Sequence, residues 1–153
     1  MDLLAVVRPD SWNFPLFIHV LGAMLWTGTL LLAVIAFADQ RRGGDPRFGF
    51  LTLLRASIPA YIVMRVGAQL VADKEKLSDS DDAWIGIGYA VTDIGVLLLI
   101  IATICAYIAT RRARSAEAGT STGTGLATAS MVLSGILLVA ALVAMWAMTT
   151  KPV

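Results

Sequence analysis

The chain is poor in charged residues and in residues that bind metals. Only 15% of its 153 residues are charged, against about 25% in an average soluble domain. It has one cysteine, Cys105, which excludes an intrachain disulfide and a cysteine-rich metal site; we expect it to be a small buried residue. One histidine, His19, cannot supply a tetrahedral zinc site. The net charge of +1 gives no electrostatic reason to expect a nucleic-acid partner.

Apolar residues are abundant instead. They make up 58% of the chain, and the mean hydropathy is +0.77. A helix needs about 20 mostly apolar residues to cross a bilayer, and four segments meet that requirement: 14–38, 50–72, 84–110 and 126–149. The sequence therefore predicts an all-α integral membrane four-helix bundle. We expect residues 1–153 to form a single transmembrane domain embedded in the lipid bilayer.

Basic residues are distributed unequally between the two sides of the predicted bundle. The loops after the first and third spans carry six arginines close to helix ends, and the opposite side carries four basic residues. Cytoplasmic loops of membrane proteins are enriched in lysine and arginine. We therefore expect the arginine loops to be cytoplasmic and both termini to lie on the outer side. The six arginines are Arg41, Arg42, Arg47, Arg111, Arg112 and Arg114; the four others are Arg8, Lys74, Lys76 and Lys151.

A few strongly polar residues interrupt the predicted spans. A charged side chain at the centre of a transmembrane helix costs about 2.5–3.5 kcal/mol on insertion scales, so such residues usually face the protein interior and mark function. Counted at about 1.5 Å per residue, His19 lies roughly 7–8 Å below the outer end of its span, Arg65 roughly 10 Å and Asp93 roughly 13 Å. We expect these three to share the outer half of the bundle. Arg55 lies near the cytoplasmic end, where it can snorkel to phosphates.

Helical spacing extends this set of polar residues. Residues four apart lie on one face of a helix, so the second span has a polar line of Tyr61, Arg65 and Gln69, and Tyr89 lies above Asp93 in the third. In the first span His19 shares a face with Gly22 and Trp26, and in the second Pro59 is expected to kink the helix. The candidate binding residues are His19, Trp26, Tyr61, Arg65, Gln69 and Asp93.

These residues support more than one function. An Arg65–Asp93 ion pair could simply lock two helices, with His19 hydrogen-bonded nearby, as in a structural or accessory subunit. Alternatively, the cluster is a site for haem b or another small redox or anionic ligand. His19 would then be the metal ligand, opposite Met64 or a second His19 from a dimer mate, and an arginine would suit the propionates. A third alternative is a proton- or ion-coupled carrier in which Asp93 and His19 relay protons. The sequence leaves open whether the protein is an enzyme, and whether it assembles with itself or with another membrane protein.

The string FIHVLGAMLWTGTLLLA, with His19, Gly22, Trp26 and Gly28, resembles the first helix of a group of small bacterial membrane proteins. The group includes the copper-resistance CopD-like domain, the HemJ-type protoporphyrinogen oxidase and uncharacterised four-helix relatives, which are the best match. The resemblance implies a multi-pass protein of the bacterial inner membrane. In HemJ-like proteins the first-helix histidine is implicated in haem binding, and this role carries over to His19 alone. The spans contain no second histidine and no lysine, so the resemblance does not extend to HemJ-type catalysis or to a CopD-like copper ligand set.

Overall fold

The computed structural model describes residues 10–75, 83–115 and 124–150, which are helical apart from short turns and contain no strand. The helices are α1 (Asp10–Gln40), α2 (Pro46–Thr52), α3 (Ile58–Glu75), α4 (Ala83–Ser115) and α5 (Thr124–Thr149). A π-helical turn, η1 (Leu53–Ser57), joins α2 to α3, so that these three elements form one continuous rod.

Four helical rods in the described residues are long and apolar enough to cross a membrane: Asn13–Gln40, Arg47–Lys74, Ile85–Ser115 and Gly125–Thr149. The predicted all-helical bundle of four long apolar helices is thus confirmed, with helix ends that differ from the predicted ones by a few residues. At the start of the second rod, the Asp45 side chain accepts a hydrogen bond of 2.8 Å from the Arg47 backbone N–H, and Pro46 follows in the first turn. Both are common signals for a helix N-terminus.

The second span does not break at its proline. Pro59 lacks a backbone N–H and cannot make the regular hydrogen bond to the residue four positions earlier. In the structure the π-helical turn η1 lies immediately before it, and the Ile58 N–H bonds to the carbonyl of Leu53, five residues back. A π-turn changes the direction of a helix locally. The predicted distortion is therefore a widened turn, after which α3 continues as a regular helix.

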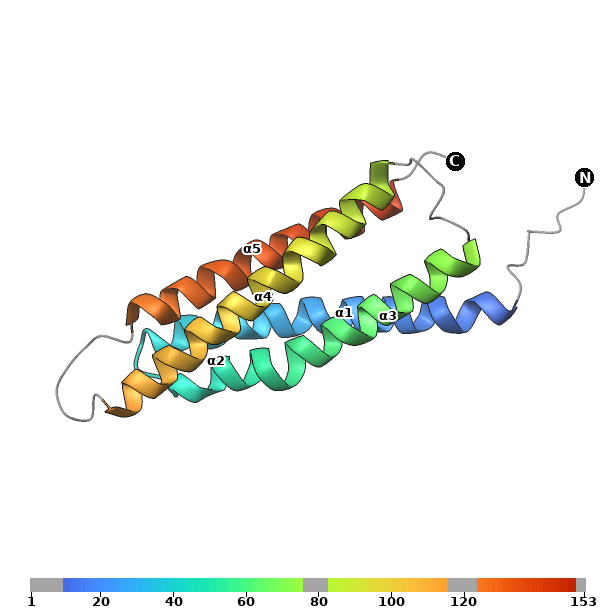
Figure 1. The fold of residues 1–153 in the computed structure, drawn as a ribbon. Helices are drawn as coiled ribbons and strands as arrows, with labels where there is room; N and C mark the ends of the chain where they lie inside the picture. Colours follow the sequence, from blue (N-terminus) through green and yellow to red (C-terminus); the bar gives the residue numbers. More distant parts are fainter. Residues whose placement is uncertain (1–9, 76–82, 116–123, 151–153) are drawn as a thin grey trace, which may run out of the picture.

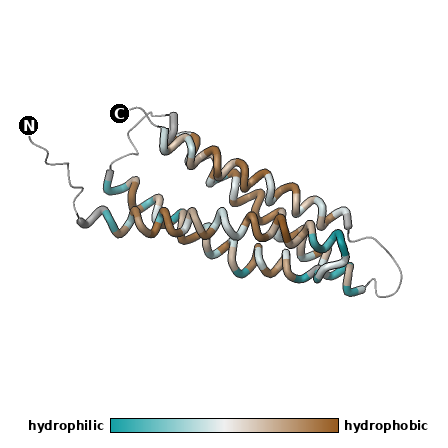
Figure 2. Tube along the Cα trace, turned by 180° about the vertical axis from the view of Figure 1, so that it is seen from behind, coloured by the Kyte–Doolittle hydropathy of each residue, from teal (hydrophilic) through white to brown (hydrophobic). Residues whose placement is uncertain are grey.

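The helices pack as two antiparallel pairs, α1 with α3 and α4 with α5, joined mainly by contacts of α1 with α5. The α3 and α4 helices contact each other only slightly. Figures 1 and 2 show from opposite sides that the two pairs diverge toward the end where α1 begins and α5 ends. The apolar core is consequently concentrated toward the other end. It contains Trp26, Leu30, Ala33, Phe37, Leu53, Ala60, Tyr61, Met64, Leu99, Ala102, Ala106, Ala109, Ala127, Leu137 and Ala141.

Alanines share the interior with aromatic residues and a few leucines, and many more large aliphatic side chains lie on the outside. Alanines line the core, and Ser130 in α5 donates a hydrogen bond of 2.9 Å to the carbonyl of Ala102 in α4. Exposed leucines, isoleucines and valines occur on every long helix, and Figure 2 shows apolar residues along most of their length. Small residues at helix contacts and bulky apolar residues on the outside are typical of membrane bundles.

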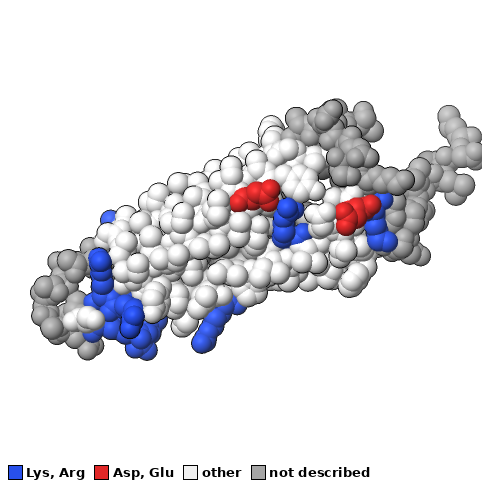
Figure 3. All heavy atoms as spheres, in the orientation of Figure 1, with Lys and Arg blue, Asp and Glu red and all other residues white. Residues whose placement is uncertain are grey.

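Basic side chains gather at one end of the bundle, where α1 meets α2 and where α4 ends (Figure 3). The six loop arginines noted above belong to this end, which we call the arginine end; the opposite end is the open end, since the helix pairs diverge there. Between them most of the visible surface is uncharged, apart from acidic and basic side chains lying together near its middle and a separate basic side chain nearer the arginine end (Figure 3).

Candidate functional site

His19 lies on the face of α1 that points toward the other helices. The same face carries Trp26, Leu30, Ala33 and Phe37, which are between 0% and 2% exposed. His19 is two helical turns farther toward the open end and is only half-buried. The loss of burial coincides with the divergence of the helix pairs. His19 therefore faces the bundle interior at a level where the packing is no longer closed.

Close contact between α1 and α3 fixes the His19 ring. A Cβ atom on Gly67 would lie 2.5 Å from the His19 backbone nitrogen, and one on Gly22 would collide with the backbone of Met64. The two helices can approach this closely only because both positions are glycine. At this crossing the His19 Nδ1 atom lies 3.1 Å from the Met64 carbonyl oxygen. A carbonyl oxygen only accepts, so Nδ1 carries the hydrogen and a neutral ring presents the lone pair of Nε2.

An aromatic layer separates His19 from the closed core. The rings of Trp26 and Tyr61 meet edge to face, with centroids 5.5 Å apart and planes at 67°. The Tyr61 hydroxyl donates a hydrogen bond of 3.0 Å to the Thr92 carbonyl of α4. The Trp26 Nε1–H is buried and has no hydrogen-bond partner among the described residues. Tyr61 therefore connects α1, α3 and α4 at the level where the helix pairs begin to diverge.

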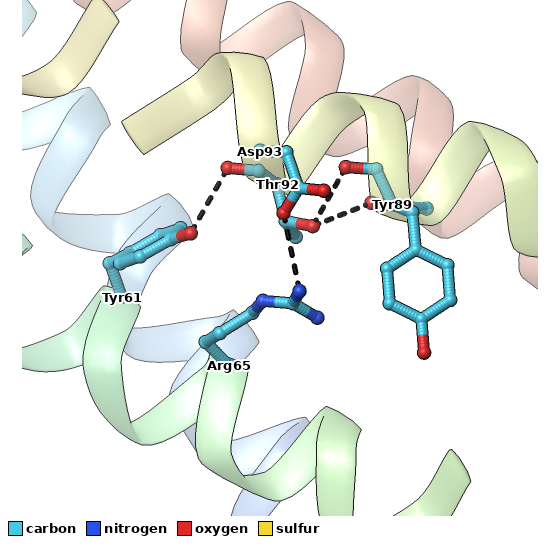
Figure 4. A network of polar contacts seen from close by, with 6 residues as sticks. Tyr61, Arg65, Tyr89, Thr92 and Asp93 are labelled. Atoms are coloured by element: carbon cyan, nitrogen blue, oxygen red, sulfur yellow. Dashed lines mark hydrogen bonds and ion pairs between the residues drawn. The ribbon is translucent and has the colours of Figure 1, made fainter. Parts of the chain in front are cut away.

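One helical turn farther toward the open end, Arg65 crosses from α3 to α4 (Figure 4). Its Nη2 atom lies 3.2 Å from Asp93 Oδ1, and its guanidinium carbon lies 5.1 Å from the centre of the Tyr89 ring. The Arg65 side chain is 30% exposed and the Asp93 side chain 61%. We call Arg65, Tyr89 and Asp93 the ion-pair site. It holds together two helices that otherwise contact each other only slightly.

Two other predicted residues lie apart from this site. The exposed Gln69 amide donates a hydrogen bond of 2.9 Å to Asp73 within α3. Arg55 is exposed in the π-turn η1, on the arginine side of the aromatic layer. Neither residue contributes a contact to the ion-pair site in the described structure.

The predicted cluster of His19, Arg65 and Asp93 is therefore divided into two neighbouring sites. Arg65 and Asp93 pair as expected, but no hydrogen bond or ion pair in the described residues joins His19 to either of them. Met64 and Arg65 are consecutive in α3, about 100° apart around the helix axis. Met64 therefore faces α1 and Arg65 faces α4. His19 and the ion-pair site share a level in the bundle but lie on different sides of α3.

Sequence reasoning missed the contributions of the backbone. The Met64 carbonyl, Gly67 and the Thr92 carbonyl all position predicted side chains. The sequence did contain one signal for Gly67. Both Gly22 and Gly67 lie in the outer halves of their predicted spans, at the depth of His19, where a glycine allows two helices to approach closely. Every residue has a backbone carbonyl, so the sequence does not indicate which carbonyl accepts a hydrogen bond from a given side chain.

No protein-family model matches this chain, and neither a curated protein nor a solved structure resembles it significantly. Among the described residues, no group of three His, Cys, Asp or Glu side chains lies close enough to hold a metal ion. The similarity to CopD-like and HemJ-like proteins remains a prediction from the first helix alone.

Proposed function

We propose that this protein is a multi-pass membrane protein that binds haem b through His19 Nε2. The proposal depends on one observation, the hydrogen bond from His19 Nδ1 to the Met64 carbonyl. Histidines that ligate metals almost always donate their other ring N–H to a carbonyl, carboxylate or water, which fixes the tautomer and the ring orientation. His19 has this arrangement, and its ring is half-buried where the helix pairs diverge.

Haem is the metal cofactor that fits a single histidine best. A structural zinc ion needs about four protein ligands, whereas a porphyrin supplies four nitrogens and needs only axial ligands from the protein. When bound, the haem iron would supply electron-transfer or oxygen chemistry. The apolar residues around the site would keep such a macrocycle out of water.

Arg65 lies outside this site. It follows Met64 directly in α3 but faces α4, where its guanidinium is paired with Asp93. The haem proposal therefore depends on His19 and does not assign Arg65 to the propionates. Trp26 and Tyr61 would close the haem site on the side of the arginine end, because both rings are buried and contact each other edge to face.

The distribution of arginines supports a location for this site. Because basic residues mark the cytoplasmic side, we place the arginine end in the cytoplasm and both termini outside. His19 then lies in the outer half of the bilayer. The first-helix resemblance supports the inner membrane of a bacterium.

An absorption spectrum tests the proposal. The protein is expressed with ample haem precursor and purified in a mild detergent, and we expect a Soret band. His19→Gly should lose that band, and added imidazole should restore part of it by occupying the vacated space. Gln69→Ala is the matched control, because among the described residues Gln69 hydrogen-bonds to Asp73 of its own helix; its spectrum should equal that of the wild type. A colourless wild type, or a Soret band unchanged in His19→Gly, would refute haem ligation by His19.

A second candidate is an accessory subunit in which the polar residues only fix the packing. The ion-pair site favours it, because Arg65 and Asp93 connect α3 to α4 where these helices scarcely touch. A stably folded wild type that stays colourless would support this candidate over haem binding.

A further inference from the structure

Asp93 is unusually exposed for a carboxylate at its depth. It lies eight residues inside the span Ile85–Ser115, roughly 12 Å along the helix, and its side chain is 61% exposed. Its neighbours Ile94 and Leu97 are 59% and 60% exposed, as expected for residues that face lipid. A charged group at such depth normally faces the protein interior or another polar group. In an isolated chain Asp93 would face acyl chains.

We infer that the exposed face of α4 around Asp93 is an interface with a second copy of this chain. The two copies would be related by a two-fold axis along the membrane normal, because both are inserted in the same orientation. In such an isologous contact both copies use the same surface, so if a residue of the first copy contacts a given residue of the second, the reverse contact also forms. The inference is independent of haem binding, since it uses only the ion-pair site and the outer surface of α4.

The charges of the ion-pair site are self-complementary. Arg65 and Asp93 form an adjacent positive and negative group on one surface. A two-fold axis beside them brings the arginine of each copy toward the carboxylate of the other. Among the described residues, the Asp93 carboxylate accepts its hydrogen bond at Oδ1, so Oδ2 remains for the second copy. Interfacial charges arranged in this way set the register between partners.

The same charges argue against a free anion or a lipid phosphate as the occupant. The Arg65 guanidinium already has a carboxylate at 3.2 Å, so an incoming anion would meet a neutral pair and be repelled by Asp93. A partner that carries both charges is favoured over a partner that carries one. A second copy of the chain carries both by definition.

The surface beside Asp93 allows a close approach. Ala90 and Gly86 lie on the same exposed stripe of α4 as Asp93, about one turn and two turns nearer the open end respectively. A Cβ atom on Gly86 would have no neighbour within 4 Å in the single chain. Small residues four apart on a membrane helix let two helix backbones come together. The two copies would then be close enough for Asp93 of each one to pair with Arg65 of the other.

Disulfide cross-linking in native membranes tests the interface. Cys105→Ala removes the one native thiol, and Ala90→Cys then places a single cysteine on the proposed interface. Val143→Cys is the matched control, because Val143 is 50% exposed on α5 and also lies toward the open end. After mild oxidation we expect a covalent dimer for Ala90→Cys, at least ten times more abundant than for Val143→Cys.

Two outcomes of this experiment would overturn the proposal. Equal cross-linking at both positions would indicate random collision, and an adduct of Ala90→Cys with a protein of different mass would indicate another partner. The wild-type chain gives a second test without mutation. Its subunit number in membrane-derived nanodiscs should be two, and a count of one would exclude the interface.

Charge exchange tests the role of the ion pair. Asp93→Asn should reduce dimerisation, measured by energy transfer between labelled copies in vesicles, at least tenfold. The double variant Arg65→Asp with Asp93→Arg keeps one charge of each sign on the surface, so it should regain at least half of the lost energy transfer. A dimer unaffected by Asp93→Asn would show that the charges do not form the contact.

Discussion

The crossing of α1 and α3 should be highly sensitive to one added methyl group at Gly67. A Cβ atom there would lie 2.5 Å from the His19 nitrogen and 2.6 Å from its Cα atom. Non-bonded heavy atoms prefer separations of about 3.5–4.0 Å, so Gly67→Ala must move the two helices apart by about 1 Å. The contact atoms belong to the backbone of α1, which cannot be relieved by a change of rotamer.

This displacement has an energetic and a functional consequence. Overpacking a closed contact costs typically about 1–3 kcal/mol. An added 1 Å would also take the His19–Met64 hydrogen bond beyond bonding distance from its present 3.1 Å. We therefore expect Gly67→Ala to destabilise the bundle and to reduce haem retention as well.

Gly28→Ala is the control that isolates the crossing. Gly28 also lies inside a membrane helix, but a Cβ atom there would have nothing within 4 Å. Both variants gain the same helix propensity, about 0.5–1 kcal/mol for alanine over glycine, so it cancels in the comparison. Reversible unfolding in SDS should show Gly67→Ala less stable than Gly28→Ala by about 1–3 kcal/mol. Equal stability of the two variants would refute the close approach of α1 and α3.

Two further predictions concern the aromatic layer and the orientation. Tyr61→Phe removes the hydrogen bond to the Thr92 carbonyl but keeps the ring against Trp26, so it should cost about 0.5–1.5 kcal/mol of stability. Tyr107→Phe, at an exposed position, should cost less in the same SDS titration, and equal losses would contradict the role of Tyr61. Gly43→Cys in the Cys105→Ala background places a thiol in the first arginine loop, and an impermeant maleimide should label it only after the cells are permeabilised. Labelling in intact cells would reverse the proposed orientation.

The spans and the ion pair could be predicted because their signals are local and strong. Four apolar segments of sufficient length fix four helices, and a lone arginine and a lone aspartate in neighbouring spans at similar depth have a strong reason to pair. The four-residue spacing of Tyr61 and Arg65 also placed both on the side of α3 that reaches α4. Counting residues from the ends of the spans therefore predicted correctly that Arg65 and Asp93 lie at the same level along the bundle.

Rotation about each helix axis was the coordinate that the sequence left undetermined. His19 and Arg65 are at similar depths. Whether they meet depends on the rotation of α3 about its axis, which decides whether Arg65 or a neighbouring residue faces His19 in α1. That choice follows from Gly22 and Gly67, which allow the backbones to meet at Met64 and His19. Once this contact forms, Arg65 must point about 100° away from Met64, toward α4.

The separation of the two sites gives each its own chemistry. If His19 had joined the ion pair, a carboxylate would lie against one of its ring nitrogens. Its bond to the Met64 carbonyl instead occupies Nδ1 and fixes the ring orientation, so that Nε2 is left for another partner. The carboxylate meanwhile satisfies Arg65 on the other side of α3, where it is exposed to whatever covers α4. Two glycines in the α1–α3 contact thus determine that His19 faces the α1–α3 crossing while the ion pair faces α4. The first arrangement suits the proposed ligand and the second the proposed interface.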